Sequence, residues 1–228
     1  MREWLRRALV EKVPRDHREA PHELRRRQRV TLLFLALGAA VLAISLRIEP
    51  GSGWFYPATL ALALVWTVGA FASGPLHLGR IDHADGARRP VLTPVVLGLL
   101  LAALFGLGGV VVRQVPFLDE QVRAVVEHAD QGAGPLIVLV TVVNGIAEEL
   151  FFRGAAYAAT TRHPVPVTTV AYVLATMATG NVMLAFAAVL LGTLVALERR
   201  ASGGILAPIL THVTWSLCML LVLPALFS

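Results

Sequence analysis

Charged residues are scarce in this sequence. Only 15% of its 228 residues are Asp, Glu, Lys or Arg and 56% are hydrophobic, whereas a soluble domain carries about 25% charged and about 45–50% apolar residues. This balance excludes an ordinary water-soluble fold, and it excludes a disordered chain because disorder requires low hydrophobicity. The single cysteine, Cys218, also excludes a secreted module held together by disulfides.

The formal net charge of +5 is concentrated at the N-terminus. Residues 1–29 hold ten basic and five acidic side chains, while the other 199 residues hold ten of each sign. The excess therefore lies in one segment that ends against an apolar run, which is typical of a basic segment at a membrane surface. We expect the lipid bilayer as a partner and no nucleic acid.

Long apolar runs predict the fold class. A helical span needs about 20 apolar residues to cross a bilayer, with about 17–25 tolerated. We therefore expect an all-α, polytopic transmembrane bundle of about seven spans, of which the fifth and sixth are short. The expected spans are Val30–Leu46, Trp54–Ala72, Val91–Val112, Pro135–Thr160, Val165–Ala178, Val182–Leu197 and Ile205–Phe227.

The positions of the basic residues agree with this number of spans. If the N-terminus is cytosolic and each span reverses the side, the cytosolic segments hold sixteen basic residues and the outer segments hold three. Such an excess on one side follows the positive-inside rule. The sequence thus predicts a multi-pass protein of the plasma (inner) membrane with a cytosolic N-terminus.

Two local patterns predict how helices lie and pack. Residues 116–128 place Leu118, Val122 and Val125 on one face, so we expect a short amphipathic helix on the outer surface. In the sixth expected span, small residues recur every four positions and favour close helix packing. These residues are Ala188, Gly192 and Ala196.

Few ionisable residues fall well inside the expected spans, and such residues are functional candidates because the membrane interior disfavours them. They are Glu148, Glu149, Arg153 and His212. Glu149 and Arg153 are four residues apart, so they can form an ion pair on one helix face. At 1.5 Å per residue, Glu148 lies roughly 18 Å from the cytosolic end of its span and His212 about 10 Å from its own. A shared cavity can therefore contain both.

The segment Glu148-Glu149-Leu150-Phe151-Phe152-Arg153-Gly154 resembles the EExxxR motif of the CAAX-protease and bacteriocin-processing (CPBP, or Abi) family. Residues 207–212, which end at His212, resemble the family's last histidine motif. The resemblance covers about residues 135–223. It suggests three parts: a basic cytosolic tail (1–29), N-terminal transmembrane helices with the outer amphipathic segment (30–134), and a CPBP-like core (135–228).

The resemblance implies an intramembrane endopeptidase, of glutamic or metallo type, that cleaves a membrane-anchored protein or peptide. Substrates of this family include CAAX-type proteins and bacteriocin leaders. Carried over to this sequence, Glu148 activates water as general base and His212 holds the oxyanion or a metal. The Glu149–Arg153 pair is then structural, and Asn144, one turn before Glu148, is a supporting residue.

Two departures from the family pattern concern the site. The segment 171–181 lacks the middle-motif histidine and offers only Thr176, Thr179 and Asn181 as polar groups, and Ser216 stands where the family has Asn. A catalytic zinc normally takes three protein ligands. Because Glu149 is expected to pair with Arg153, too few donors remain, and we predict no metal site.

The sequence leaves three function classes open. The first is the endopeptidase. The second is a catalytically inactive CPBP-like protein that binds a membrane partner, in which Glu148 is protonated and hydrogen-bonded to Asn144 or His212. The third is a small-solute transporter, because the two short spans around Gly180 and Asn181 resemble discontinuous helices.

Overall fold

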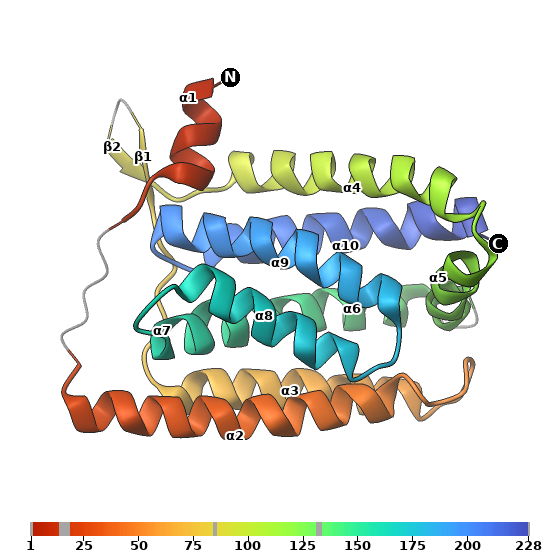
Figure 1. The fold of residues 1–228 in the computed structure, drawn as a ribbon, viewed down its shortest axis with the longest axis horizontal. Coiled ribbons are helices and arrows are strands. Elements are labelled where there is room, and N and C mark those ends of the chain that lie inside the picture. Colours follow the sequence, from red (N-terminus) through yellow and green to blue (C-terminus); the bar gives the residue numbers. More distant parts are fainter. Residues whose placement is uncertain (1, 14–18, 84–85, 131–133, 228) are drawn as a thin grey trace.

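The computed structural model describes residues 2–13, 19–83, 86–130 and 134–227, with only the backbone described at residues 2, 81–83, 86–88, 129 and 130. Long helices run side by side and form a bundle (Figure 1). The elements are α1 (Arg2–Leu5), the π-helical turn η1 (Arg6–Val10), α2 (Pro21–Ser45), α3 (Phe55–Ser73), β1 (Ile81–His83), β2 (Gly86–Arg88), α4 (Leu92–Val112), α5 (Pro116–Asp130), α6 (Gly134–Glu149), the π-helical turn η2 (Leu150–Ala156), α7 (Tyr157–Ala159), α8 (Pro164–Met177), α9 (Val182–Ser202) and α10 (Leu206–Phe227).

The prediction of a polytopic helical bundle is confirmed. Within the described ranges, six helices are long and apolar enough to cross a membrane, and α6, η2 and α7 together make one of them. The expected fifth span corresponds to α8, whose 14 residues make about 21 Å at 1.5 Å per residue, less than a bilayer core. The described chain therefore has six helices of spanning length where about seven spans were expected. The only strands in the described chain are β1 and β2, which pair antiparallel.

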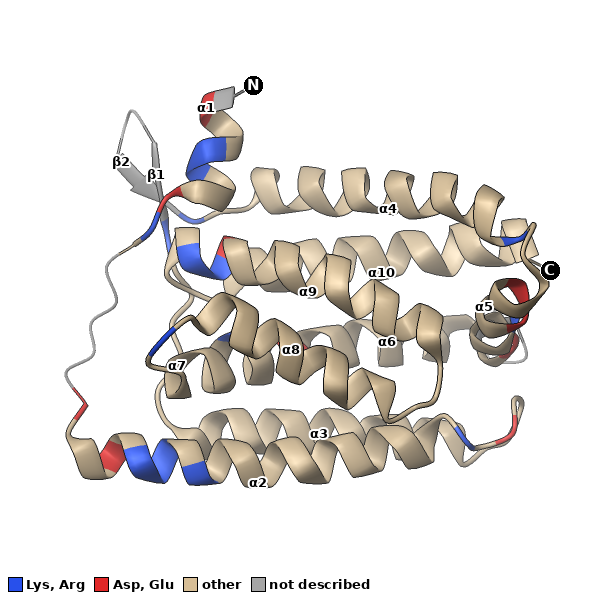
Figure 2. Cartoon of the chain, in the orientation of Figure 1, with Lys and Arg blue, Asp and Glu red and all other residues tan. Residues whose placement is uncertain are grey.

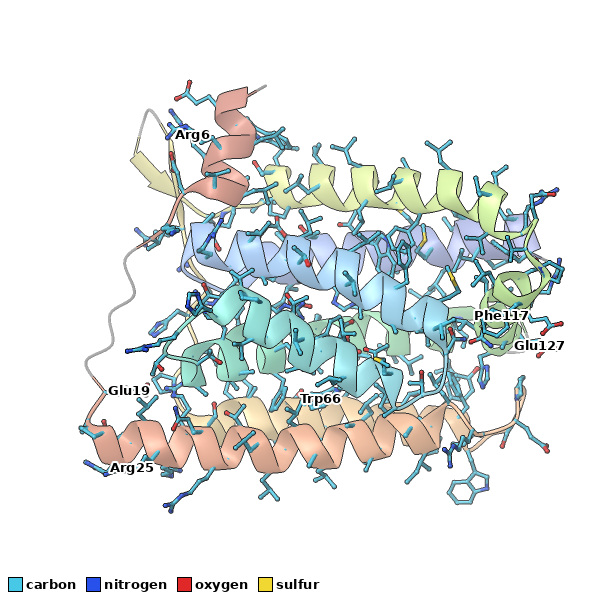
Figure 3. All side chains as sticks on the ribbon, in the orientation of Figure 1. Arg6, Glu19, Arg25, Trp66, Phe117 and Glu127 are labelled. Atoms are coloured by element: carbon cyan, nitrogen blue, oxygen red, sulfur yellow. The ribbon has the colours of Figure 1, made fainter. Side chains whose placement is uncertain are left out.

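The first long helix begins before the apolar run. α2 starts at Pro21, a residue that suits the first helical turn because its missing N–H needs no partner there. The Glu23 carboxylate accepts a hydrogen bond from the Ala20 N–H at 3.0 Å, which satisfies one of the free donors at the helix start. Part of the basic segment is therefore helical, with Arg25 on its first turns (Figure 3).

Basic residues gather at the end of the bundle where α2 begins and α9 ends, and fewer lie at the opposite end (Figure 2). The N-terminal segment packs at this basic end. The Trp4 indole donates to the Thr93 hydroxyl at 2.9 Å, and the Arg200 guanidinium donates to the Leu9 carbonyl at 2.8 Å. Which membrane face this end occupies stays a prediction.

The amphipathic segment forms a helix, as expected. α5 lies at the end of the bundle opposite α1 (Figure 1). Its Val122 and Val126 are buried against Phe227 of α10. Arg123 pairs with Asp119 at 2.7 Å and also donates to the Phe227 carbonyl. The apolar face is thus covered by the bundle.

The core between α3 and the α6–η2 helix is aromatic. Trp66 extends from α3 to the inside of the bundle (Figure 3), and its ring centroid lies 4.6 Å from that of Phe151 and 5.1 Å from that of Phe152. Both phenylalanines are at most 1% exposed. Rings at these separations attract each other beyond their burial. This contact ties the N-terminal helices to the segment that carries the EExxxR motif.

α4 and α10 approach each other closely at Gly98. A Cβ at this position would lie 2.8 Å from the Thr211 carbonyl oxygen and 2.8 Å from the Thr214 Cβ. In the same region the Thr211 hydroxyl donates to the Pro94 carbonyl at 3.0 Å. Small residues at helix contacts in membranes allow this backbone approach. Gly98 therefore helps to fix α10, the helix that carries His212.

Replacing Gly98 by Ala is expected to lower the free energy of unfolding by about 1–3 kcal/mol, because the added methyl forces α4 and α10 apart. Gly108 on the same helix is the matched control, since a Cβ there meets nothing within 4 Å. Gly108→Ala should leave stability unchanged or raise it by up to about 1 kcal/mol. Denaturation of the detergent-solubilised variants measures both, and an equal effect would contradict the close α4–α10 contact.

Candidate functional site

The EExxxR segment lies where α6 changes into a π-helical turn. Glu148 and Glu149 are the last two residues of α6, and Arg153 lies within η2. π-Helical turns inside α-helices are rare and frequently occur at functional sites. The side chains of Glu148, Glu149 and Arg153 face α8, α9 and α10 from this segment.

Glu149 is the centre of a buried ionic cluster. Its Oε1 accepts from Arg153 Nη1 at 3.1 Å and lies 2.8 Å from His212 Nδ1. Glu149 and Arg153 are 0% exposed, and His212 is 5% exposed. The pairing of Glu149 with Arg153 has the spacing expected from the sequence, and the cluster also includes His212. Through it, α6 and η2 are joined to α10.

Arg153 connects the cluster to two further helices. Its Nη2 donates to the Gly192 carbonyl of α9 at 3.1 Å, and its guanidinium carbon lies 4.8 Å from the centre of the Tyr172 ring of α8. A cation over an aromatic face is attracted to it. Close packing at Gly192 allows both contacts, because a Cβ there would lie 3.0 Å from Tyr172 Cδ1. Gly192 belongs to the small-residue pattern predicted for α9, in which Ala188 and Ala196 are also buried.

Glu148 has a different environment from its neighbour. It is half-buried, and its Oε2 accepts a hydrogen bond from the Tyr172 hydroxyl at 2.6 Å. The two partners weighed from the sequence were Asn144 and His212, but Asn144 donates to the Val140 carbonyl at 2.9 Å and His212 Nδ1 faces Glu149. A buried tyrosine hydroxyl usually needs a partner, which is the only sequence signal that pointed to Tyr172.

The other expected supporting residues do not all reach the site. Asn181 caps α9, where its Oδ1 accepts from Met183 N and Leu184 N at 3.0 Å, and its Nδ2 donates to the Gln121 carbonyl. Thr179 donates to the Thr176 carbonyl at 2.7 Å. Both therefore build the α8–α9 turn.

Thr176 and Ser216 are each one turn from a site residue. The Thr176 hydroxyl is turned back onto its own helix, where it donates to the Tyr172 carbonyl at 2.9 Å. Ser216 lines an apolar cavity of about 390 Å³ between α4, α5, α9 and α10. No contact places either hydroxyl on Glu148, so the polar group that α8 brings to the site is the Tyr172 phenol.

A further buried glutamate, Glu198, was not predicted from the sequence, because the expected sixth span ended at Leu197. α9 continues to Ser202, so Glu198 lies on the helix and is 1% exposed. Among the described residues, neither of its carboxylate oxygens has a hydrogen-bond partner. No contact joins Glu198 to Glu148.

The donor set does not fit a catalytic zinc ion, which takes three protein ligands. Glu149 Oε1 is engaged by both Arg153 and His212, which leaves Glu148 and the far nitrogen of His212. Nowhere in the described part of the chain do three His, Cys, Asp or Glu side chains gather in a metal-binding arrangement. We therefore derive no step through a metal.

A comparison with known protein families finds a match over the region that carries this site. Residues 131–218 match a family described as type II CAAX prenyl endopeptidase Rce1-like. This match supports the resemblance of the region around the EExxxR segment to the CPBP family. No curated protein and no solved structure matched the chain.

Two Glu→Gln substitutions test the ionic cluster. Glu149→Gln leaves the buried Arg153 guanidinium without a carboxylate, so we expect a loss of about 3–5 kcal/mol in the free energy of unfolding. Glu198→Gln removes a carboxylate that no charged group pairs with, and its effect should stay below about 1 kcal/mol. Unfolding of both variants in detergent measures the difference. Equal stability of the two would contradict a structural role for Glu149.

Proposed function

We propose that this membrane protein, whose residues 131–218 carry the Rce1-like region, is an intramembrane endopeptidase in which Glu148 activates the attacking water. The observation that carries the proposal is the different environment of the two adjacent glutamates. Glu149 is sealed and bonded to Arg153 and His212, whereas Glu148 is half-buried and bonded to a neutral hydroxyl. A general base must be within reach of water and not neutralised by a cation.

The reaction needs one proton acceptor and one oxyanion donor. Glu148 takes a proton from water as the water oxygen attacks the peptide carbonyl carbon, which forms a tetrahedral oxyanion. Glu148 then returns the proton to the amide nitrogen as the carbon–nitrogen bond breaks, and the products are a carboxylic acid, which later ionises, and an amine. Proton transfer by a positioned side chain contributes about 10²–10⁴-fold to rate.

His212 is the proposed oxyanion donor. Its Nδ1 faces Glu149 at 2.8 Å, and its Nε2 is on the side of Gly145, where a Cβ would lie 3.8 Å away. When the ring is protonated both nitrogens are donors, so Glu149 holds one N–H and the other can bond the developing charge. A donor that is fixed before the reaction stabilises the transition state without reorganisation.

The proposed substrate is a membrane-anchored protein or peptide of the CAAX or bacteriocin-leader type. Its scissile bond would enter from the cytosolic side, because Glu148 and His212 were both expected in the cytosolic half or the middle of the bundle. The proposed location is the plasma (inner) membrane, with the basic end of the bundle in the cytosol. The membrane-spanning helices would then contact both the lipid and the membrane-anchored substrate.

The second candidate function is a CPBP-like protein that binds a membrane partner without cleaving it. The absence of a histidine from residues 171–181 favours this candidate, since the family's middle motif supplies a second group for water activation. In that case the Glu148–Tyr172 bond is only a structural contact. Turnover separates the two functions.

Glu148→Gln is expected to lower turnover at least a hundredfold, because an amide cannot accept the proton from water. The measurement uses the full-length protein in proteoliposomes with a series of membrane-anchored peptides that carry CAAX or leader sequences. Glu198→Gln is the matched control and should keep wild-type turnover. If Glu148→Gln cleaves as fast as the wild type, or the wild type cleaves none of the peptides, the binding function is favoured.

Metal chelators are expected to leave turnover unchanged, because the donor set is too small for zinc and the proposed base is a carboxylate. The assay compares initial rates in the same proteoliposomes after incubation with a membrane-permeant chelator and after later addition of zinc. A loss of activity that zinc restores would show that a metal takes part and would contradict the metal-free mechanism.

A further inference from the structure

We infer that Tyr172 is a positioning residue for the reaction: its hydroxyl holds one oxygen of Glu148, so that the other oxygen faces the attacking water. The inference rests on the proposed function and goes beyond it, since it assigns the second polar group of the water-activating site. It begins from the 2.6 Å bond between the Tyr172 hydroxyl and Glu148 Oε2.

The Tyr172 ring is held on several sides. Its centroid lies 4.9 Å from that of Phe152, the Arg153 guanidinium lies 4.8 Å from the ring centre, and Gly192 of α9 leaves just enough room for the ring edge. Tyr172 is 9% exposed. Because the ring cannot turn away without losing these contacts, its hydroxyl has a fixed place relative to α6.

A fixed hydroxyl reduces the freedom of the glutamate. A glutamate side chain has three rotatable bonds, whereas a tyrosine ring has two, so the phenol is the more rigid partner. An ionised carboxylate accepts hydrogen bonds at both oxygens. With Oε2 occupied by the phenol, Oε1 is the oxygen that accepts the proton of water. The orientation of a reacting group strongly affects the rate: a misplacement of 1 Å can lower it about a hundredfold.

The structure also distinguishes Tyr172 from the other polar groups of its segment. Thr176, one turn later on α8, donates to the Tyr172 carbonyl, and Thr179 and Asn181 form the turn to α9. The segment that lacks the family's histidine thus still brings one donor to Glu148. That donor is a neutral phenol, so it holds the Glu148 carboxylate in place without forming an ion pair with it.

The same contacts connect the Glu149–Arg153 ion pair to the Glu148 carboxylate. Arg153 bonds Glu149 and also lies over the Tyr172 ring, and the Tyr172 hydroxyl bonds Glu148. The buried ion pair therefore places the aromatic ring, and the ring places the reactive carboxylate. This arrangement gives the otherwise structural Glu149–Arg153 pair an indirect part in the geometry of the reaction.

Tyr172→Phe tests the inference, because it removes the hydroxyl and keeps the ring. We expect kcat to fall about 10- to 100-fold, with KM and the unfolding temperature unchanged. Tyr157→Phe, which removes a hydroxyl from another buried tyrosine outside the cluster, is the control and should keep wild-type kcat. A wild-type kcat in Tyr172→Phe would overturn the inference.

A double-mutant cycle with Glu148→Asp separates positioning from general stability. The shorter aspartate withdraws its carboxylate from the phenol, so adding Tyr172→Phe to Glu148→Asp should cause no further loss of kcat. An equal loss in both backgrounds would overturn the inference, because it would mean that the hydroxyl acts elsewhere. If Glu148→Gln is inactive while Tyr172→Phe is fully active, only the positioning role fails. If Glu148→Gln is fully active, the proposed function fails and the positioning role fails with it.

Discussion

The bundle depends on the neutralisation of one carboxylate, that of Glu149. A charge without a partner in a dry interior is strongly destabilising, and removing one member of a buried pair costs about 3–5 kcal/mol. Arg153 and His212 both approach Glu149 Oε1, so η2 and α10 have to lie where they do. Arg153 in turn bonds α9 and covers the Tyr172 ring of α8. Four parts of the bundle therefore meet at one ionic cluster.

Because of this constraint, Glu149 and Glu148 have different roles. Glu149 and Glu148 are adjacent, so they point to different faces of the helix at the start of the π-helical turn. One face is sealed by Arg153, His212 and packing, and the other is half-buried and bonded to a phenol. A carboxylate that is paired with a cation is a poor base, and an unpaired one is costly to bury. The site meets both demands by using both residues.

Much of this arrangement was predictable from the sequence, and the exceptions have physical reasons. Apolar runs predict most of the spans, and the scarcity of intramembrane charge singles out Glu148, Glu149, Arg153 and His212. The role of Tyr172 was missed because a tyrosine counts as apolar in a span, and its hydroxyl partner lies 24 residues away in the chain. Glu198 was missed because the apolar run stops before α9 does, and Asn181 was grouped with the site although it caps a helix.

Labelling with a hydrophobic carbodiimide, which modifies membrane-embedded carboxyl groups, tests the division between the two glutamates most directly. Mass spectrometry of the reconstituted, full-length protein would locate the label, and turnover would be followed in the same sample. The structure predicts modification of Glu148 without modification of Glu149, with loss of turnover in proportion to the label. Modification of Glu149, or complete modification of Glu148 with full turnover, would contradict the assignment of Glu148 as the reactive carboxylate.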